Sequence, residues 1–204
     1  LFLDISKAFD SVTMEAVLSA MERQEVHSHI TSFVQNLAKH SNSAVVVNGV
    51  PVPINIGRGV RQGDCLSPRL FTAVLQEVFG SMPWSRKGIN INGQFISHLL
   101  FADDAVLISH DARQIQKMVD QLERGLASVG LSLNGSKTVA MASKQTTIVI
   151  VSEQPAKVVE KVIYLGTHLS FDDTQKSEMQ RRIRAGMFAF NRYRPFFTSK
   201  IIPM

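Results

Sequence analysis

Cysteine is almost absent from this sequence: Cys65 is the only one among 204 residues. A single cysteine excludes an internal disulfide framework and suits a reducing compartment. The chain has no CxxC pair, and its six histidines lack the spacing of zinc ligands. A disulfide-stapled secreted domain and a zinc-binding module are therefore not expected.

Long apolar runs are also missing. The longest candidate, residues 45–60, is interrupted by an Asn-Gly pair, two prolines and Arg58, so no segment is long enough to span a bilayer. The sequence shows no signal peptide. Its apolar share of 45% suits one globular domain of ordinary size, or one domain with an appendage. We expect no membrane partner.

Acidic side chains are scarce at the end of the chain. Residues 176–204 contain seven lysines and arginines but only Glu178 as an acid, a net charge of +6, while the whole chain carries +5. All of the basic excess therefore lies in this last segment. Such a segment indicates an anion-facing surface, with nucleic acid as the obvious partner. A merely solvated helix is the alternative.

Hydrophobic periodicity predicts helices mixed with hairpins rather than a regular βα alternation. An antiparallel sheet with helices packed on one face follows, an α+β fold that leaves the other face free for a long polymer. The expected strands are 1–5, ending near Asp4, then 138–142, 147–151 and 160–169, with hairpins at Asn48-Gly49, Asn92-Gly93 and 96–109. The expected helices follow Thr13 as N-cap and occupy 28–40, 67–82, 111–129 and 173–193, the last with Met179, Ile183, Met187 and Phe190 facing inward.

Two adjacent carboxylates, Asp103 and Asp104, lie between two apolar, strand-forming runs within residues 98–109. An unpaired buried carboxylate is costly, and a hard divalent cation such as Mg²⁺ removes that cost. An ordinary Asp-Asp hairpin turn is the alternative. If this hairpin pairs with the strand that ends at Asp4, the carboxylates converge on one edge. Since neighbouring strand residues point to opposite faces, one of the doublet is expected to be the direct ligand.

Carboxylates grouped on a rigid sheet edge suit one kind of chemistry in particular. Two or three of them can hold two Mg²⁺ ions about 3.5–4 Å apart. Such a pair activates an attacking hydroxyl and stabilises the leaving oxygen of an in-line phosphoryl displacement. This is the chemistry of nucleotidyl transfer.

Five short strings, in one order along the chain, resemble motifs A to E of the reverse transcriptases of non-LTR (LINE-type) retrotransposons. They are LDISKAFDSV at 3–12, RQGDCLSP at 61–68, FADD at 101–104, GLSLNGSKT at 130–138 and YLG at 164–166. Each string alone is weak. Five of them in register over about 165 residues make the resemblance specific.

The resemblance implies a right-hand polymerase palm at 1–170 and the start of a basic helical thumb at 171–204. It implies an RNA-directed DNA polymerase that adds dNTPs to a DNA primer on an RNA template, with two Mg²⁺ ions, or Mn²⁺, as cofactor. The chain begins at motif A, so we expect a piece of a longer polypeptide that supplies the fingers, most of the thumb and any endonuclease domain. The fragment alone is expected to be inactive. The resemblance also implies an intracellular localisation, in the nucleus or the cytoplasm, where retrotransposons of this family replicate.

Catalytic roles carry over by position in the motifs. Asp4 and Asp103 would be the principal metal ligands, with Asp104 beside them, and Lys137 would protonate the departing pyrophosphate. Phe9 resembles the steric gate that excludes a 2′-hydroxyl; core packing is its ordinary role. Lys137 is otherwise a solvated lysine.

Binding roles follow in the same way. The backbone amides of Lys7, Ala8 and Phe9 would face the triphosphate, and Gln62 and Gly63 would contact the incoming nucleotide and the template. The resemblance places primer and template contacts at Arg61, Tyr164, Leu165, Gly166, Arg181, Arg182 and Arg184. One departure stands out: the family usually has proline where this chain has Cys65, so we expect a looser turn after Asp64.

Three other interpretations compete with this one. A non-catalytic, nucleic-acid-binding remnant of a retroelement would keep the fold without turnover. A group II intron maturase-type reverse transcriptase shares the motifs, although FADD and YLG favour the retrotransposon. A viral RNA-dependent RNA polymerase palm shares the carboxylates, but Phe9 argues against it because an enzyme that uses ribonucleotides should not block the 2′-hydroxyl.

Overall fold

The computed structural model describes the chain except for residues 42, 55, 144–147, 172–173 and 200–204. The chain forms two compact units. The first comprises residues 1–140 and 146–157, and the second comprises residues 141–145 and 158–204.

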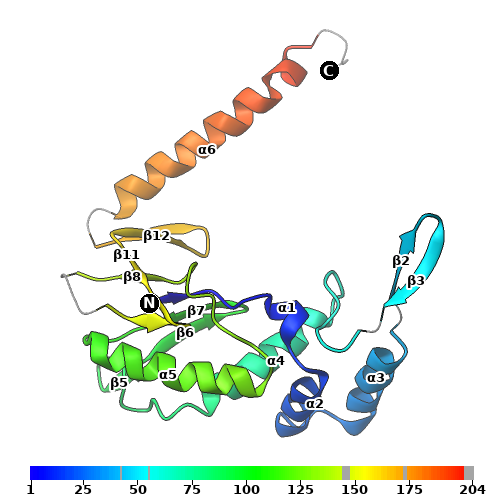
Figure 1. The fold of residues 1–204 in the computed structure, drawn as a ribbon. Helices are drawn as coiled ribbons and strands as arrows, with labels where there is room; N and C mark the ends of the chain where they lie inside the picture. The colour runs from blue at the N-terminus through cyan, green and yellow to red at the C-terminus, as the bar shows by residue number, and fades with distance from the viewer. Residues whose placement is uncertain (42, 55, 144–147, 172–173, 200–204) are drawn as a thin grey trace. The chain divides into compact units, whose positions relative to one another are not determined.

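A mainly antiparallel sheet lies at the centre of the first unit. Its strands are β1 (Phe2–Leu3), β6 (His98–Phe101), β7 (Asp104–Leu107) and β8 (Val139–Met141), in the order β8-β1-β7-β6. A further strand, β11 (Lys157–Val159), begins at the last residue of this unit. β1 pairs antiparallel with both β7 and β8, and β6 pairs antiparallel with β7. Figure 1 shows α4 (Ser67–Gly80) and α5 (Ala112–Ser128) on one side of these strands. The prediction of a mixed fold with an antiparallel sheet is confirmed.

The hydrophobic core lies between the sheet and these two helices. From the sheet, Leu3 and Leu107 are buried, and from the helices Phe71 and Met118 are fully buried. The period of 3.6 residues in α5 brings its apolar side chains onto one stripe, and five of them are buried: Ile115, Met118, Val119, Leu122 and Leu126. This packing fixes the positions of β1 and β7. It thereby also fixes Asp4, which follows β1, and Asp104, which begins β7.

Three short helices precede the first hairpin: α1 (Ala8–Ser11), α2 (Met14–Arg23) and α3 (Ser28–Lys39). As predicted, Thr13 caps α2, its side chain accepting a hydrogen bond from the Ala16 N–H at 3.2 Å. α3 matches the predicted 28–40 closely. Of its apolar face, however, only Val34 is buried.

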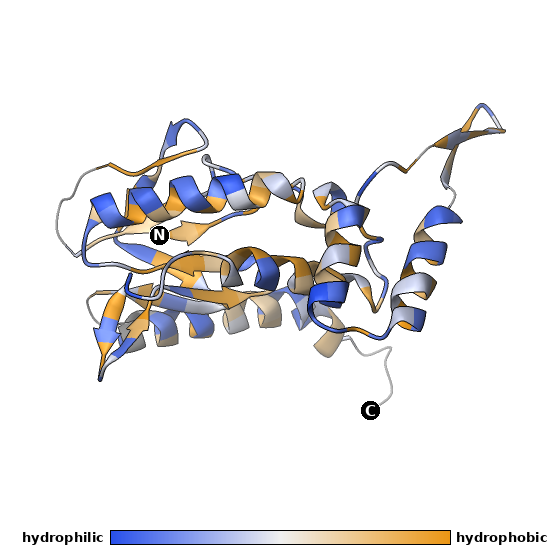
Figure 2. Ribbon diagram, turned by 90° about the horizontal axis from the view of Figure 1, so that it is seen from below, coloured by the Kyte–Doolittle hydropathy of each residue, from blue (hydrophilic) through white to orange (hydrophobic). Residues whose placement is uncertain are grey.

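Both predicted Asn-Gly hairpins are confirmed. β2 (Ser43–Val47) and β3 (Val50–Ile54) are joined by Asn48 and Gly49 at φ 50° and 83°. β4 (Ile89–Ile91) and β5 (Gln94–Ile96) are joined by Asn92 and Gly93 at φ 52° and 89°. Two positive φ values suit the turn that matches strand twist. Figure 2 shows hydrophobic colour along both strands of the β2–β3 hairpin, whose residues are all exposed.

A further hairpin in the first unit was not predicted in this form. β9 (Ile150–Val151) and β10 (Gln154–Pro155) pair across Ser152 and Glu153, both at positive φ. The expected strand at 147–151 starts at residue 147, which lies outside the described residues. Gln116 of α5 holds the hairpin, because its side chain bonds both the N–H and the carbonyl of Ile150.

The second unit corrects one prediction about its strands. The expected strand at 160–169 is a hairpin of β12 (Lys161–Tyr164) and β13 (Thr167–Ser170) that turns at Leu165 and Gly166. This hairpin groups with α6 (Thr174–Phe197). The chain passes between the two compact units after residues 140, 145 and 157. The palm boundary expected after residue 170 stays a prediction.

The orientation predicted for the last helix is wrong. Met179, Ile183, Met187 and Phe190, expected to face inward, have exposed fractions of 54–58% in α6. Among the α6 residues whose burial is described, the buried one is instead an acid, Glu178, at 9%. None of the helices within the described residues combines the length and the apolar character needed to cross a membrane.

Candidate active site

The pairing of β1 with β7 brings two of the predicted carboxylates to one edge of the sheet. Leu3 pairs with Ala105, and Phe2 pairs with Val106. Asp4 follows Leu3 along the first strand, and Asp104 precedes Ala105 on the antiparallel partner. Residues more than ninety positions apart in the chain are thereby placed at the same edge.

Asp103 lies in the turn between β6 and β7. Phe101 pairs with Asp104, which leaves Ala102 and Asp103 as a two-residue connection. Ala102 has φ 52°, a left-handed conformation uncommon outside glycine and asparagine. Asp103 thus lies at the tip of the hairpin and Asp104 at the start of β7.

The three carboxylates influence one another electrostatically. The pKa of Asp104 is raised, first by partial burial of its carboxyl group, then by the negative charge of Asp103 and then by that of Asp4. Negative potential of this kind attracts a cation, and carboxylate oxygens are the ligands Mg²⁺ prefers. The donor set therefore fits a divalent ion by charge and chemistry. Within the described residues, however, no three His, Cys, Asp or Glu side chains already form a metal-holding group.

The segment 130–138 runs alongside the residues that follow β1. Ile5 forms a bridge with Leu133, and the Ser6 N–H donates to the Ser132 carbonyl at 2.8 Å. The Asn134 N–H donates to the Asp4 carbonyl at 2.8 Å. As a result the Lys137 ammonium lies 3.9 Å from Oδ2 of Asp4. The structure thus brings together two residues that the sequence analysis assigned separate catalytic roles.

Thr138 is a residue of this site that the sequence analysis missed. Its side chain is fully buried. The hydroxyl accepts a hydrogen bond from the Asp4 N–H at 3.3 Å and donates one to the Asn134 carbonyl at 2.9 Å. The threonine therefore ties the turn that carries Lys137 to the end of β1. A buried hydroxyl beside a lysine gives no distinctive signal in the sequence.

Phe9 packs on the core from the short helix α1. Its ring stacks on that of Phe71, with 4.9 Å between centroids and 29° between planes, and Phe71 is fully buried. Lys7 precedes the helix in a left-handed conformation, φ 44°. Ala8 has its side chain buried, so only its backbone is available to a ligand. The ring of Phe9 is held from one side by the core.

The loop 57–63 is fastened to the same helix. The Val60 N–H donates to the Phe9 carbonyl at 2.7 Å, and the Gly59 N–H donates to the Val12 carbonyl at 2.8 Å. Nε2 of Gln62 donates to Oδ1 of Asp10 at 3.0 Å. The structure therefore places Gln62 next to the helix that carries Phe9. Asp10 is a second residue that the sequence analysis did not single out.

The rest of this loop is open. Arg61, Gln62 and Gly63 are exposed, and Gly63 has φ 86°. Beyond it, Oδ1 of Asp64 accepts the Leu66 N–H at 2.9 Å. This hydrogen bond closes the turn that the replacement of proline by Cys65 was expected to loosen.

The predicted primer and template contacts of the second unit lie on the β12–β13 turn and on α6. Leu165 and Gly166 have φ 47° and 75° and are exposed, and Tyr164 is half-buried. Arg181 and Arg182 both bond Glu178. Arg184 is exposed, and none of the described ion pairs involves it. The three arginines are therefore not equivalent.

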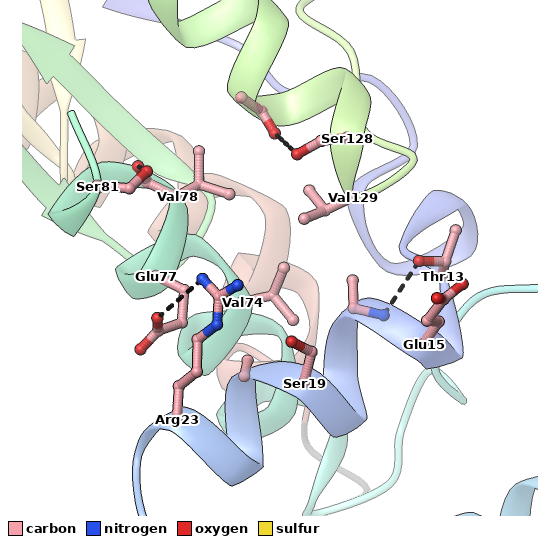
Figure 3. Close-up of a pocket in the computed structure, with 13 residues that line it drawn as sticks. Thr13, Glu15, Ser19, Arg23, Val74, Glu77, Val78, Ser81, Ser128 and Val129 are labelled. Atoms are coloured by element: carbon pink, nitrogen blue, oxygen red, sulfur yellow. Dashed lines mark hydrogen bonds and ion pairs between the residues drawn. The ribbon is translucent and has the colours of Figure 1, made fainter.

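A pocket elsewhere in the first unit does not coincide with this site. Figure 3 shows its lining, which comes from α2, α4, α5 and their ends, with Arg23 of α2 near Glu77 of α4. Their ion pair spans 3.9 Å and is partly exposed. None of the predicted site residues lines the pocket. The pocket is therefore lined by other residues than the carboxylates at the sheet edge.

Comparison with known proteins decides the family. Residues 1–169 match the family described as "Reverse transcriptase (RNA-dependent DNA polymerase)". The chain belongs to the reverse transcriptase family. This match confirms the resemblance drawn from the five strings, and the mixed fold with its antiparallel sheet is consistent with the polymerase palm of that family.

Individual relatives are retrotransposon proteins. The chain is 32% identical over 161 residues to "Retrovirus-related Pol polyprotein from type-1 retrotransposable element R2" of Nasonia vitripennis, covering 76% of this chain and 16% of that protein. It is 30% identical over 148 residues to the "Retrovirus-related Pol polyprotein from type-2 retrotransposable element R2DM" of Drosophila melanogaster, covering 70% and 13%. This reverse transcriptase chain thus spans about a sixth of the first relative's length. The relatives support the expected non-LTR kinship.

Proposed function

We propose that this chain is the palm part of an RNA-directed DNA polymerase of a non-LTR retrotransposon, which adds dNTPs to the 3′-hydroxyl of a DNA primer on an RNA template. The observation that carries the proposal is the sheet register. It places Asp4 and Asp104 at one edge, with Asp103 next to Asp104. The Lys137 ammonium lies 3.9 Å from Oδ2 of Asp4. Charged groups of both signs at one place are what a phosphoryl transfer needs.

The carboxylates of Asp4, Asp103 and Asp104 are the residues that would hold Mg²⁺, or Mn²⁺. When bound, two such ions would activate the primer hydroxyl and stabilise the leaving oxygen of pyrophosphate. The pKa of Asp104 is raised first by partial burial and then by the charges of Asp103 and Asp4. This supports the assignment, because a bound cation offsets both costs of a charged carboxylate. The backbone of Asp4 is held by hydrogen bonds of both its N–H and its carbonyl. The side chain that bears its carboxylate therefore extends from a fixed backbone position.

Lys137 acts as the proton donor in this proposal. In the free protein its ammonium partly neutralises Asp4 at 3.9 Å. The lysine is exposed and has a long, flexible side chain. The ammonium therefore turns from Asp4 to the leaving pyrophosphate and protonates it.

Selection of the nucleotide falls to α1 and the loop 57–63. Phe9, backed by Phe71, presents a ring that collides with a 2′-hydroxyl, and the amides of Lys7 and Ala8 face the triphosphate. Gln62 contacts the incoming nucleotide from a position fixed by Asp10. Gly63 lets the backbone approach closely because it has no side chain, and Arg61 contacts the template strand.

Primer extension tests the proposal. A polypeptide that joins this chain to its fingers and complete thumb is expected to extend oligo(dT) on poly(rA) in the presence of Mg²⁺ or Mn²⁺. Asp103→Asn removes one carboxylate charge at the hairpin tip and should abolish extension, whereas Asp111→Asn, which keeps the acceptor that caps α5, serves as a control. Extension that survives Asp103→Asn would contradict the metal assignment.

One observation favours a second candidate, a non-catalytic nucleic-acid-binding remnant. No group of three potential metal ligands is already assembled in the described part of the chain. A remnant would bind a primer–template duplex but show neither extension nor Mn²⁺ binding in the joined polypeptide. Mn²⁺ titration of that polypeptide therefore separates the two functions.

A further inference from the structure

A buried acid joins the two elements of the second unit. The side chain of Glu178 on α6 is only 12% exposed. Its Oε2 accepts the N–H of His168 on β13 at 2.8 Å and Nε of Arg181 at 2.9 Å. Its Oε1 accepts Nη2 of Arg181 at 2.8 Å and Nε of Arg182 at 2.6 Å. Both carboxylate oxygens are thus fully engaged.

Arg181 extends this network to the β12–β13 turn. Besides its two-pronged bond with Glu178, its Nη2 donates to the carbonyl of Gly166 at 2.5 Å. Two parallel N–H···O bonds between a guanidinium and a carboxylate fix orientation as well as distance. The guanidinium of Arg181 therefore bonds both Glu178 of α6 and the Gly166 carbonyl of the β12–β13 turn, and so links the helix to the turn. Hydrogen bonds from both arginines, with smaller contributions from the His168 N–H and the Arg181 charge, hold the pKa of Glu178 far below its usual range despite desolvation.

We infer that Glu178 and Arg181 are positioning residues, which lock the Tyr164–Gly166 turn onto α6, and that Arg181 serves this lock rather than a nucleic-acid phosphate. The inference rests on the proposed function for its nucleic-acid part only. Arg184 differs from Arg181 on the same helix: it is exposed, and none of the described ion pairs involves it. Of the three arginines predicted to contact nucleic acid, Arg184 is the one whose guanidinium is left for a phosphate. Arg182, 67% exposed, shares the two roles.

Amide exchange in the free 204-residue chain tests the lock without any nucleic acid. Glu178→Gln replaces one acceptor oxygen by an NH₂ group, and Arg181→Lys keeps the charge but cannot form the two-pronged bond. Both should speed exchange of the His168 amide severalfold relative to the β13 amides that bond β12. Glu160→Gln, the same change at an exposed acid of this unit, should leave it unchanged. Exchange at His168 that stays at the wild-type rate in both variants would overturn the lock.

The direction in which Glu178→Gln changes the affinity for a short DNA duplex tests the positioning role. Glu178→Gln removes a negative charge near a basic helix, so simple electrostatics predicts tighter binding of a polyanion. A displaced turn predicts weaker binding, and we expect a severalfold loss at fixed salt. Glu160→Gln should bind as well as wild type or slightly better. Binding of Glu178→Gln as tight as that of Glu160→Gln would show that the lock positions nothing for nucleic acid.

The salt dependence of duplex binding separates the two arginines. Each phosphate contact contributes about 0.9 to the slope of log K against log salt. Arg184→Gln should therefore flatten the slope by about this amount, and Arg181→Gln should leave it at the wild-type value. An equal flattening by both changes would make Arg181 a phosphate contact. If the wild-type chain shows no salt-dependent binding, the proposed function fails, while amide exchange at His168 still decides the lock.

Discussion

The ammonium of Lys137 lies 3.9 Å from Oδ2 of Asp4, although the two residues come from strings far apart in the chain. The contact depends on the backbone bonds that align residues 132–134 with residues 4–6. A lysine in this place competes with a divalent cation for the same carboxylate. In the proposed function it also protonates the leaving pyrophosphate. Both consequences are open to measurement.

Lys137→Gln should tighten Mn²⁺ binding to the 204-residue chain, measured by calorimetric titration. An exposed ion pair is worth at most about 1 kcal/mol, so we expect a gain of up to about fivefold. Lys39→Gln, an equal charge change at the end of α3, is the control. In the joined polymerase, the polypeptide that unites this chain with its fingers and complete thumb, Lys137→Gln should lower kcat by about 10²–10⁴-fold. This is the usual cost of losing a general acid. Unaltered Mn²⁺ affinity together with unaltered kcat would remove both roles.

The carboxylate cluster should give the metal-free chain a characteristic pH dependence. The pKa of Asp104 is raised in the folded state, so between pH 3.8 and that raised pKa the native state binds more protons than the unfolded state. The free energy of unfolding therefore falls as the pH rises through this window. Above it, the native state carries the full repulsion of Asp103 and Asp4.

Asp104→Asn removes this repulsion and should raise Tm at pH 7. The side chain is exposed, so the gain is below about 1 kcal/mol, or roughly 2–4 °C at most for a chain of this size. The difference from wild type should vanish as the pH approaches 3.5, and saturating Mg²⁺ should reverse it. Thermal unfolding followed by circular dichroism gives both values. A Tm difference that does not change with pH would show that Asp104 is not under electrostatic strain.

Local turn chemistry explains which parts of the fold the sequence predicts. Asn48-Gly49 and Asn92-Gly93 adopt positive φ because of their own residue types, and both hairpins are found where expected. The turn at Leu165 was missed because leucine rarely adopts φ 47°, so the surrounding apolar residues suggested one continuous strand. The tertiary structure overrides local preference there.

The candidate site shows the same division. Asp4 and the Asp103-Asp104 doublet were predictable because carboxylates at strand ends are conspicuous. The hydrogen bond between Asp10 and Gln62 joins residues 52 positions apart, and no periodicity encodes it. Arg181 was predicted to contact nucleic acid because the sequence shows that its segment is basic, but not which partners each basic side chain has. Only the fold shows that Glu178 and the Gly166 carbonyl already bind it.

Gly59 should be indispensable to the loop that carries Gln62. Its φ is 94°, and a Cβ atom there would lie 2.9 Å from the Asp10 carbonyl oxygen and 3.0 Å from that of Phe9. Gly59→Ala therefore combines backbone strain with a clash against main-chain atoms, and should destabilise the chain by at least about 1–2 kcal/mol. Gly57→Ala is the matched control, since nothing lies within 4 Å of its added Cβ. Chemical denaturation measures both, and equal effects would contradict the close approach.

The hydrogen bond between Asp10 and Gln62 should matter for nucleotide binding. Asp10→Ala frees the Gln62 amide, and in the joined polymerase we expect KM for dNTP to rise severalfold, because a net hydrogen bond contributes about 0.5–1.5 kcal/mol. Gln62→Ala should raise KM similarly, and the double variant should add little further. Glu15→Ala, an exposed acid in the first turn of α2, controls for charge. Additive effects would mean that Asp10 does not act through Gln62.

Phe9 is the residue on which the choice between deoxyribonucleotides and ribonucleotides depends in this proposal. Its ring cannot retreat, because the fully buried Phe71 stacks on it at 4.9 Å. Phe9→Val should therefore lower the ratio of kcat/KM for dNTP to that for rNTP by at least about tenfold, equivalent to ~1.4 kcal/mol. Phe33→Val, on the exposed face of α3, should leave the ratio unchanged. Phe71→Leu keeps the gate residue but removes its support, and an intermediate loss of discrimination is expected. If the ratio stays constant in Phe9→Val while the protein remains folded, the ring serves the core alone.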